Sequence, residues 1–66
     1  MVRARCIKFV EERGFGFLRP LDGGADIFVH VTKIPGEVPL REGELVDIET
    51  EASPRGPRAI FVQRVG

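Results

Sequence analysis

The chain has 66 residues, with ten Lys or Arg side chains and ten Asp or Glu side chains, so its formal net charge is zero. A chain of this length buries only about 60% of the surface that it exposes when unfolded, which leaves room for one core, and we expect a single domain over residues 1–66. Because the chain is not basic overall, its net charge gives no argument for a nucleic-acid partner.

Five segments combine β-branched, aromatic and alternating polar residues in the manner of β-strands, and Gly- and Pro-rich turns separate them. No segment has helical spacing over an ordinary helix length, although Thr32 is predicted to cap a short helical turn that ends at Pro35. In the loop that follows, Val38 and Leu40 are expected to turn back toward the core. These features predict an all-β fold, a small closed antiparallel barrel. The predicted strands are residues 3–10, 15–20, 26–31, 44–52 and 58–65.

Alternation along the second and third strands separates two sets of side chains. One face carries aromatic and charged residues, namely Arg13, Phe15, Phe17, Arg19, Asp26, Phe28 and His30. The other face carries Gly14, Gly16, Leu18, Ile27, Val29 and Val31. Only one face can form the core of so small a domain, and the charged face is the costly one to bury. We therefore predict that the phenylalanine rings face solvent, where rings beside cations form a stacking platform for the bases of single strands.

The charges are unevenly divided along the chain. Residues 1–33 hold six basic and four acidic side chains, whereas residues 34–66 hold four basic and six acidic ones. The half with the aromatic strands is therefore net positive, which permits a locally attractive face on a neutral protein.

The composition gives no support for catalysis or for metal binding. Cys6 is the only cysteine and His30 the only histidine, which excludes an internal disulfide and a four-ligand zinc site. A general acid or base needs a positioned partner, and the chain also lacks a Gly-x-x-x-x-Gly-Lys phosphate loop. We expect no enzyme activity, no catalytic residue, no metal and no cofactor. The lone thiol, the lack of a signal peptide and the lack of ~20 consecutive apolar residues favour a cytoplasmic protein that does not enter the membrane.

Two motifs of the chain resemble those of the cold-shock domain. Residues 13–18 read Arg-Gly-Phe-Gly-Phe-Leu and residues 27–31 read Ile-Phe-Val-His-Val, close to the family's Lys-Gly-Phe-Gly-Phe-Ile and Val-Phe-Val-His-Phe. The resemblance continues through residues 22–26, 40–43 and 55–59, and so covers nearly the whole chain. It implies a five-stranded antiparallel OB-fold (oligonucleotide/oligosaccharide-binding) barrel that binds single-stranded RNA or DNA with little sequence preference. Members of the family often act as RNA chaperones or cold-shock regulators of gene expression in the bacterial cytoplasm.

The resemblance also implies roles for individual aromatic side chains. Phe15, Phe17 and Phe28 would stack on successive bases of the bound strand. His30 would stack or form a hydrogen bond beside them.

Charged side chains complete the site that the resemblance implies. Arg13 stands where the family has a basic residue near the phosphates, and Asp26 stands where a carboxylate often hydrogen-bonds a base edge. Arg55 and Arg58 lie in or beside a late loop that can touch the backbone of the bound strand.

The chain departs from the family at several aromatic positions. Lys8 stands in place of Trp, Val31 in place of Phe and Phe61 in place of Asn, and the shortened loop at residues 35–39 has no aromatic residue. At roughly 1–3 kcal/mol per stacked base, these losses predict weaker binding than is usual, about micromolar. Lys8 is expected to return part of the affinity through a phosphate contact. For Phe9 and for Phe61 the sequence leaves two alternatives, a position in the core or a contact with the ligand.

The partner is not fully specified by these residues. An OB-type protein-interaction module is the main alternative to nucleic-acid binding, because neutral charge and lost aromatics also fit a barrel whose rings contact a protein. We expect a monomer, with a strand-swapped dimer as the alternative. Neither RNA nor DNA is favoured, because base stacking does not depend on the 2′-hydroxyl.

Overall fold

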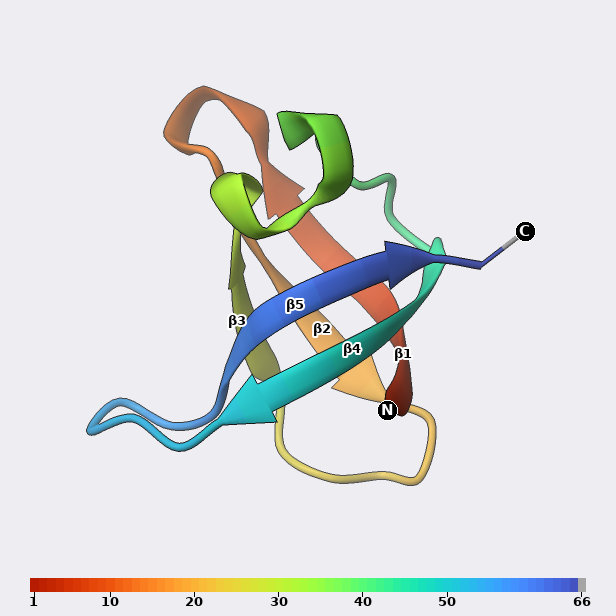
Figure 1. Cartoon of the computed structure of the whole chain (residues 1–66), viewed down its shortest axis with the longest axis vertical. Coiled ribbons are helices and arrows are strands. Elements are labelled where there is room, and N and C mark those ends of the chain that lie inside the picture. The colour runs from red at the N-terminus through yellow and green to blue at the C-terminus, as the bar shows by residue number, and fades with distance from the viewer. Residues whose placement is uncertain (66) are drawn as a thin grey trace.

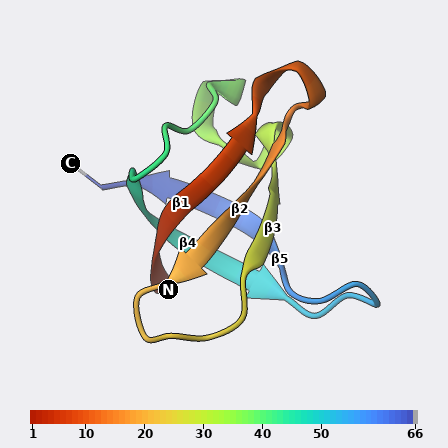
Figure 2. The same cartoon turned by 180° about the vertical axis from the view of Figure 1, so that it is seen from behind.

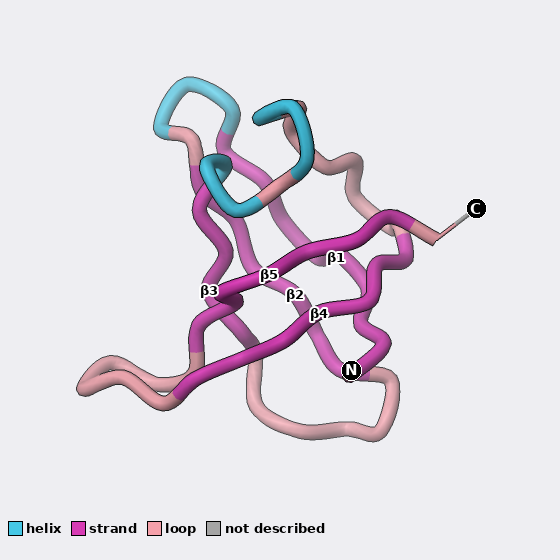
Figure 3. Tube along the Cα trace, viewed as in Figure 1, coloured by secondary structure: helices cyan, strands magenta, loops and turns pink. Residues whose placement is uncertain are grey.

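A computed structural model describes residues 1–65 and shows five strands that close into a barrel (Figures 1 and 3). All five predicted strands are confirmed, and their ends differ from the predicted ones by at most one residue. Around the barrel the order is β1-β2-β3-β5-β4, and β4 pairs with β1 to close it. Figure 2 shows the side on which β1, β2 and β3 lie next to one another. The strands are β1 (Val2–Val10), β2 (Phe15–Pro20), β3 (Ile27–His30), β4 (Leu45–Glu51) and β5 (Arg58–Arg64).

One pairing corrects the prediction that the barrel is antiparallel throughout. β3 and β5 run parallel, with Phe28 opposite Arg58, and the Phe28 N–H donates to the Pro57 carbonyl at 3.1 Å. The other four neighbouring pairs are antiparallel. An odd number of strands cannot alternate in direction all the way around a closed ring, so one parallel pair is unavoidable. This pair forms the seam beside which the candidate site lies.

Aliphatic side chains fill the barrel, as the alternation of β2 and β3 predicts. Leu18, Ile27 and Val29 are buried together with residues from every other strand. Leu40 also reaches the core, but the prediction for Val38 is wrong, because its side chain is 53% exposed. The buried core residues are Ala4, Cys6, Leu18, Ile27, Val29, Ile34, Leu40, Val46, Ile48, Ala59 and Val62.

Short 3₁₀ turns make the only helical structure within residues 1–65, and none has the length and hydrophobicity needed to cross a bilayer. The predicted turn after β3 is present, but Thr32 does not cap it. The turn begins two residues earlier, at Val31, so His30 caps it, and His30 Nδ1 accepts the Thr32 backbone N–H at 3.3 Å. Val31 consequently leaves the strand and is only partly buried against the core. The turns are η1 (Glu11–Arg13), η2 (Val31–Lys33) and η3 (Pro35–Glu37).

A β-bulge between Cys6 and Lys8 decides the orientation of the last part of β1. Because one extra residue shifts the alternation, Lys8 pairs with Phe17 on the outside and Phe9 pairs with Gly16 on the inside. Phe9 packs against the core in the space that a side chain at Gly16 would need. The open question about Phe9 is therefore answered in favour of the core.

We predict that Gly16→Ala destabilises the barrel. A Cβ at this position would lie 2.5 Å from the Lys8 carbonyl oxygen and 2.5 Å from Phe9 Cδ2, so backbone and ring must both move. Overpacking of this kind costs roughly 1–3 kcal/mol, which a urea-unfolding curve resolves. Gly24→Ala is the matched control, because its nearest neighbours lie at 3.6 Å. Equal unfolding midpoints for the two variants would contradict the packing described here.

Candidate nucleic-acid interface

Phe15 and Phe17 from β2 and Phe28 from β3 form a triangle of rings on the outside of the barrel, called here the aromatic platform. The ring centroids lie 5.7 Å apart for Phe15 and Phe28, 6.0 Å for Phe17 and Phe28, and 6.1 Å for Phe15 and Phe17. The rings meet edge to face or tilted, which favours their mutual contact. Phe28 remains 38% exposed, while Ile27 and Val29 on either side of it are buried. The predicted separation of rings and aliphatic residues is thus observed.

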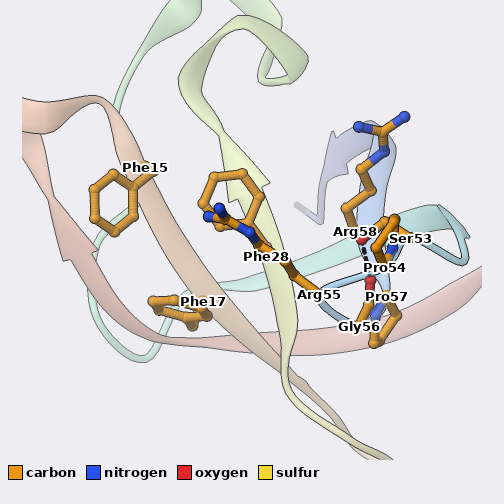
Figure 4. A pocket seen from close by; sticks show the side chains of 9 residues that line it. All are labelled: Phe15, Phe17, Phe28, Ser53, Pro54, Arg55, Gly56, Pro57 and Arg58. Atoms are coloured by element: carbon orange, nitrogen blue, oxygen red, sulfur yellow. Dashed lines mark hydrogen bonds between the residues drawn. The ribbon is translucent and has the colours of Figure 1, made fainter.

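A cleft of about 740 Å³ separates the aromatic platform from the β4–β5 loop (Figure 4). The loop, residues 52–57, is closed by reciprocal backbone hydrogen bonds of 3.1 and 2.9 Å between Ser53 and Gly56. The bond from Phe28 N–H to Pro57 holds the end of the loop against β3. Figure 4 shows Arg55 extending from the loop toward the side of Phe28. The cleft is therefore open, apolar on one wall and basic on the other.

Two side chains from neighbouring strands flank the aromatic platform. The cross-strand register places Lys8 beside Phe17 and His30 beside Phe15. His30 Nδ1 accepts the Thr32 N–H and lies 2.9 Å from Thr32 Oγ1. Since Nδ1 is an acceptor here, the neutral ring carries its proton on Nε2 and has that N–H as a donor. A hydrogen-bond donor and a cation thus lie next to the rings.

Asp26 is held in an ion pair that the sequence did not reveal. Its carboxylate accepts from Arg19 Nε at 3.0 Å and from Nη2 at 3.4 Å, at the end of β2 beyond Phe17. The hydrogen bond from Arg19 to Asp26 raises the pKa of Arg19, so the guanidinium stays charged. The predicted base-edge acceptor therefore comes with a paired donor, and both side chains are exposed.

The other predicted cations are placed unequally. Arg55 and Arg58 both line the cleft, and Arg58 Nε also donates to Glu51 at 2.6 Å. Arg13 lies exposed in η1, two residues before Phe15, and lines neither this cleft nor the groove described below. The structure thus brings Arg55 and Arg58 to the aromatic platform and leaves Arg13 at the approach to it.

The distribution of ion pairs makes this side of a neutral protein locally positive. Arg3, Arg19, Arg58 and Arg64 each have a carboxylate partner. The basic residues that have none within 4.0 Å, among residues 1–65, are Arg5, Lys8, Arg13, Lys33, Arg41 and Arg55. Of these, Lys8, Lys33 and Arg55 border the aromatic platform or a cleft beside it. Cations without a neutralising partner attract phosphate most effectively.

Carboxylates on β4 and just before it are kept ionised. A hydrogen bond from Arg3 lowers the pKa of Asp47. Burial raises the pKa of Glu44, but hydrogen bonds from the Arg41 backbone N–H and from Arg64 outweigh it, so the pKa of Glu44 lies below its usual value. Both carboxylates therefore stay ionised at neutral pH, and their ion pairs with Arg3 and Arg64 offset their negative charge.

Two side chains beside the aromatic platform were not predicted. Lys33 in η2 and Ile60 in β5 line a second groove next to Phe28 and His30. An irregularity in the β4–β5 register, where Glu49 pairs with Phe61 and Thr50 with Ala59, leaves Ile60 unpaired and exposed. No pattern in the sequence signals such a bulge.

The open question about Phe61 is answered against the core. Its side chain is 48% exposed and lies opposite Glu49, outside both clefts.

Neither the cysteine nor the acidic residues offer another kind of site. Cys6 is buried, and burial raises the pKa of its thiol. No group of three or more His, Cys, Asp or Glu side chains within residues 1–65 is arranged to hold a metal ion.

The closed five-stranded barrel and its exposed rings define a small protein of the OB-fold class. A family model described as the 'Cold-shock' DNA-binding domain matches residues 2–65. The chain is 46% identical to the probable cold shock protein A of Mycolicibacterium smegmatis over 59 residues. This aligned region covers 86% of this chain and 88% of that protein. Its identity to the probable cold shock protein A of Mycobacterium tuberculosis is 47% over 57 residues, 83% of this chain and 85% of the relative. The cold shock-like protein CspC of Escherichia coli is 41% identical over 59 residues, 86% of each chain.

The chain therefore belongs to the cold-shock domain family. This is a family of nucleic-acid-binding proteins.

Proposed function

We propose that this protein binds single-stranded RNA or DNA with low sequence specificity by stacking bases on the aromatic platform. One observation supports this above the others: three outward rings, with centroids within 6.1 Å of one another, border an open cleft on a barrel whose core is already filled by aliphatic residues. Rings that the core does not need form an exposed apolar patch, which marks an interaction site. Every base has a π-face, so such a platform is tolerant of sequence.

The side chains of the platform and those around it contact different parts of the bound strand. Phe15, Phe17 and Phe28 take the stacked bases, and the His30 Nε2–H donates to a base or phosphate oxygen. Asp26, with Arg19, offers an acceptor and donors to a base edge beyond Phe17. The bases enter between the platform and the β4–β5 loop.

Basic side chains at the rim hold the phosphates. Lys8 and Arg55 contact the backbone of the strand directly, Arg58 contacts it from its ion pair with Glu51, and Arg13 acts at the approach. The cell would use this activity as an RNA chaperone or cold-shock regulator in the cytoplasm, with the chain acting as one monomeric domain.

Replacing a platform ring should weaken binding without unfolding the protein. We expect Phe15→Ala or Phe28→Ala to reduce the affinity for a fluorescent oligothymidylate of about seven nucleotides by roughly 1–3 kcal/mol. Phe61→Ala is the matched control, because it removes an exposed ring outside the cleft. No saturable binding by the unaltered protein at low salt would instead favour a protein-interaction module.

Restoring an aromatic residue at Lys8 should tighten binding. The register places this side chain beside Phe17, so an indole there would extend the platform by one ring. One further stacked base is worth roughly 1–3 kcal/mol, which a titration of Lys8→Trp measures through tryptophan quenching. An affinity equal to that of the unaltered protein at a salt concentration that screens the Lys8 phosphate contact would remove position 8 from the stacking surface.

Salt should weaken binding with a shallow dependence. Each phosphate neutralised on a single strand contributes a slope of about −0.7 to the logarithm of the affinity against the logarithm of salt concentration. We expect Lys8→Ala to make the slope shallower by about this amount, because Lys8 has no carboxylate partner and is free to contact phosphate. An unchanged slope in Lys8→Ala would show that Lys8 does not contact phosphate.

A further inference from the structure

Arg58 lies where three strands meet, beside the aromatic platform. It pairs with Phe28 of β3 across the parallel seam and with Glu51 of β4 on its other side. Arg58 lines both the platform cleft and the second groove, whereas Glu51 lines only the second groove. The contact that holds the Arg58 side chain therefore decides whether its charge is available where the two hollows meet.

Glu51 holds this side chain by the edge of the guanidinium that binds anions best. Arg58 Nε donates to Glu51 Oε2 at 2.6 Å, and Nη2 contacts the same oxygen. Nε and Nη2 form a fork that can bind a carboxylate or a phosphate with two parallel hydrogen bonds. Figure 4 shows the Arg58 side chain directed away from loop residues 53–57, whereas Arg55 extends toward Phe28. A phosphate that approaches Arg58 thus finds this fork occupied.

The ion pair contributes little to the fold but bears directly on a bound strand. The side chains of Arg58 and Glu51 are 55% and 41% exposed, and pairs as exposed as this add little stability. A phosphate on Arg58 would lie well within the ~8 Å over which the Glu51 carboxylate acts at physiological salt. Glu51 therefore opposes phosphate binding in two ways, by occupying the guanidinium and by repelling the anion.

We infer that Glu51 is a positioning residue that restrains Arg58 and competes with the bound strand for it. In the free protein its carboxylate takes the place of a phosphate on the guanidinium. A strand on the platform must either leave Arg58 with Glu51 or displace the carboxylate. Binding is consequently weaker and less dependent on salt than two free arginines at the cleft would make it. The inference rests on the proposed function and assigns to Glu51 a role in setting the strength of binding.

Glu51→Gln tests this competition, because the amide keeps the size of the side chain and removes its charge. The affinity for an oligothymidylate of about seven nucleotides should rise about two- to fivefold, the gain expected from one exposed ion pair. The slope of the logarithm of affinity against the logarithm of salt concentration should steepen by about 0.7, because Arg58 then neutralises one more phosphate.

A double variant shows whether Glu51 acts through Arg58. Adding Arg58→Ala to Glu51→Gln should return the affinity and the salt slope to those of the unaltered protein, because the freed guanidinium is then absent. A double variant that keeps the tighter binding and the steeper slope would overturn the inference. Both side chains are exposed, so similar urea-unfolding midpoints should confirm that the variants fold.

Glu49→Gln is the matched control for Glu51→Gln. It removes the same charge from the same strand, but Glu49 lies opposite Phe61, outside both clefts, and has no basic partner within 4.0 Å among residues 1–65. We expect this variant to keep the affinity and the salt slope of the unaltered protein. Binding by Glu51→Gln that is no tighter than binding by Glu49→Gln would overturn the inference while leaving stacking on the platform intact. If neither the unaltered protein nor any variant binds the oligonucleotide, the proposed function fails and the inference fails with it.

Discussion

The structure depends on the strict alternation of side chains along β2 and β3, in a barrel that has room for only one core. Leu18, Ile27 and Val29 occupy the interior, so the residues between them must point outward. Phe15, Phe17 and Phe28 relieve part of their exposure by contacting one another. These contacts do not bury the rings fully, and Phe28 remains 38% exposed toward the cleft. The fold therefore leaves part of this apolar surface open to solvent.

Local breaks in this alternation set the borders of the site. The bulge in β1 turns Lys8 outward beside Phe17 and sends Phe9 inward over Gly16. The irregularity in β5 turns Ile60 outward next to the β3–β5 seam. Each break inserts one residue, and each adds a side chain to the rim of the aromatic platform. β-Bulges commonly re-aim side chains beside functional sites, and here they do so on both flanks.

Much of this architecture could be predicted from the residues, because strands and faces follow from periodicity within one segment. The five strands, the inward aliphatic set and the outward rings are of this kind. The parallel seam follows from the odd number of strands once closure is assumed. The pairs Arg19–Asp26 and Arg58–Glu51, the cap by His30 and the exposure of Ile60 depend on register and turn geometry, which no single segment encodes.

The neutral charge of the chain bears on how such a site would work. With no net charge there is little long-range attraction for a polyanion, and at physiological salt the field of a single cation falls off over about 8 Å. Lys8, Lys33 and Arg55 would then act only on phosphates already within reach of the rings. Affinity would come mainly from stacking, which is tolerant of sequence and modest for each base. This balance would suit the proposed RNA-chaperone role, because a strand held mainly by modest stacking dissociates more readily than one held by strong electrostatic attraction.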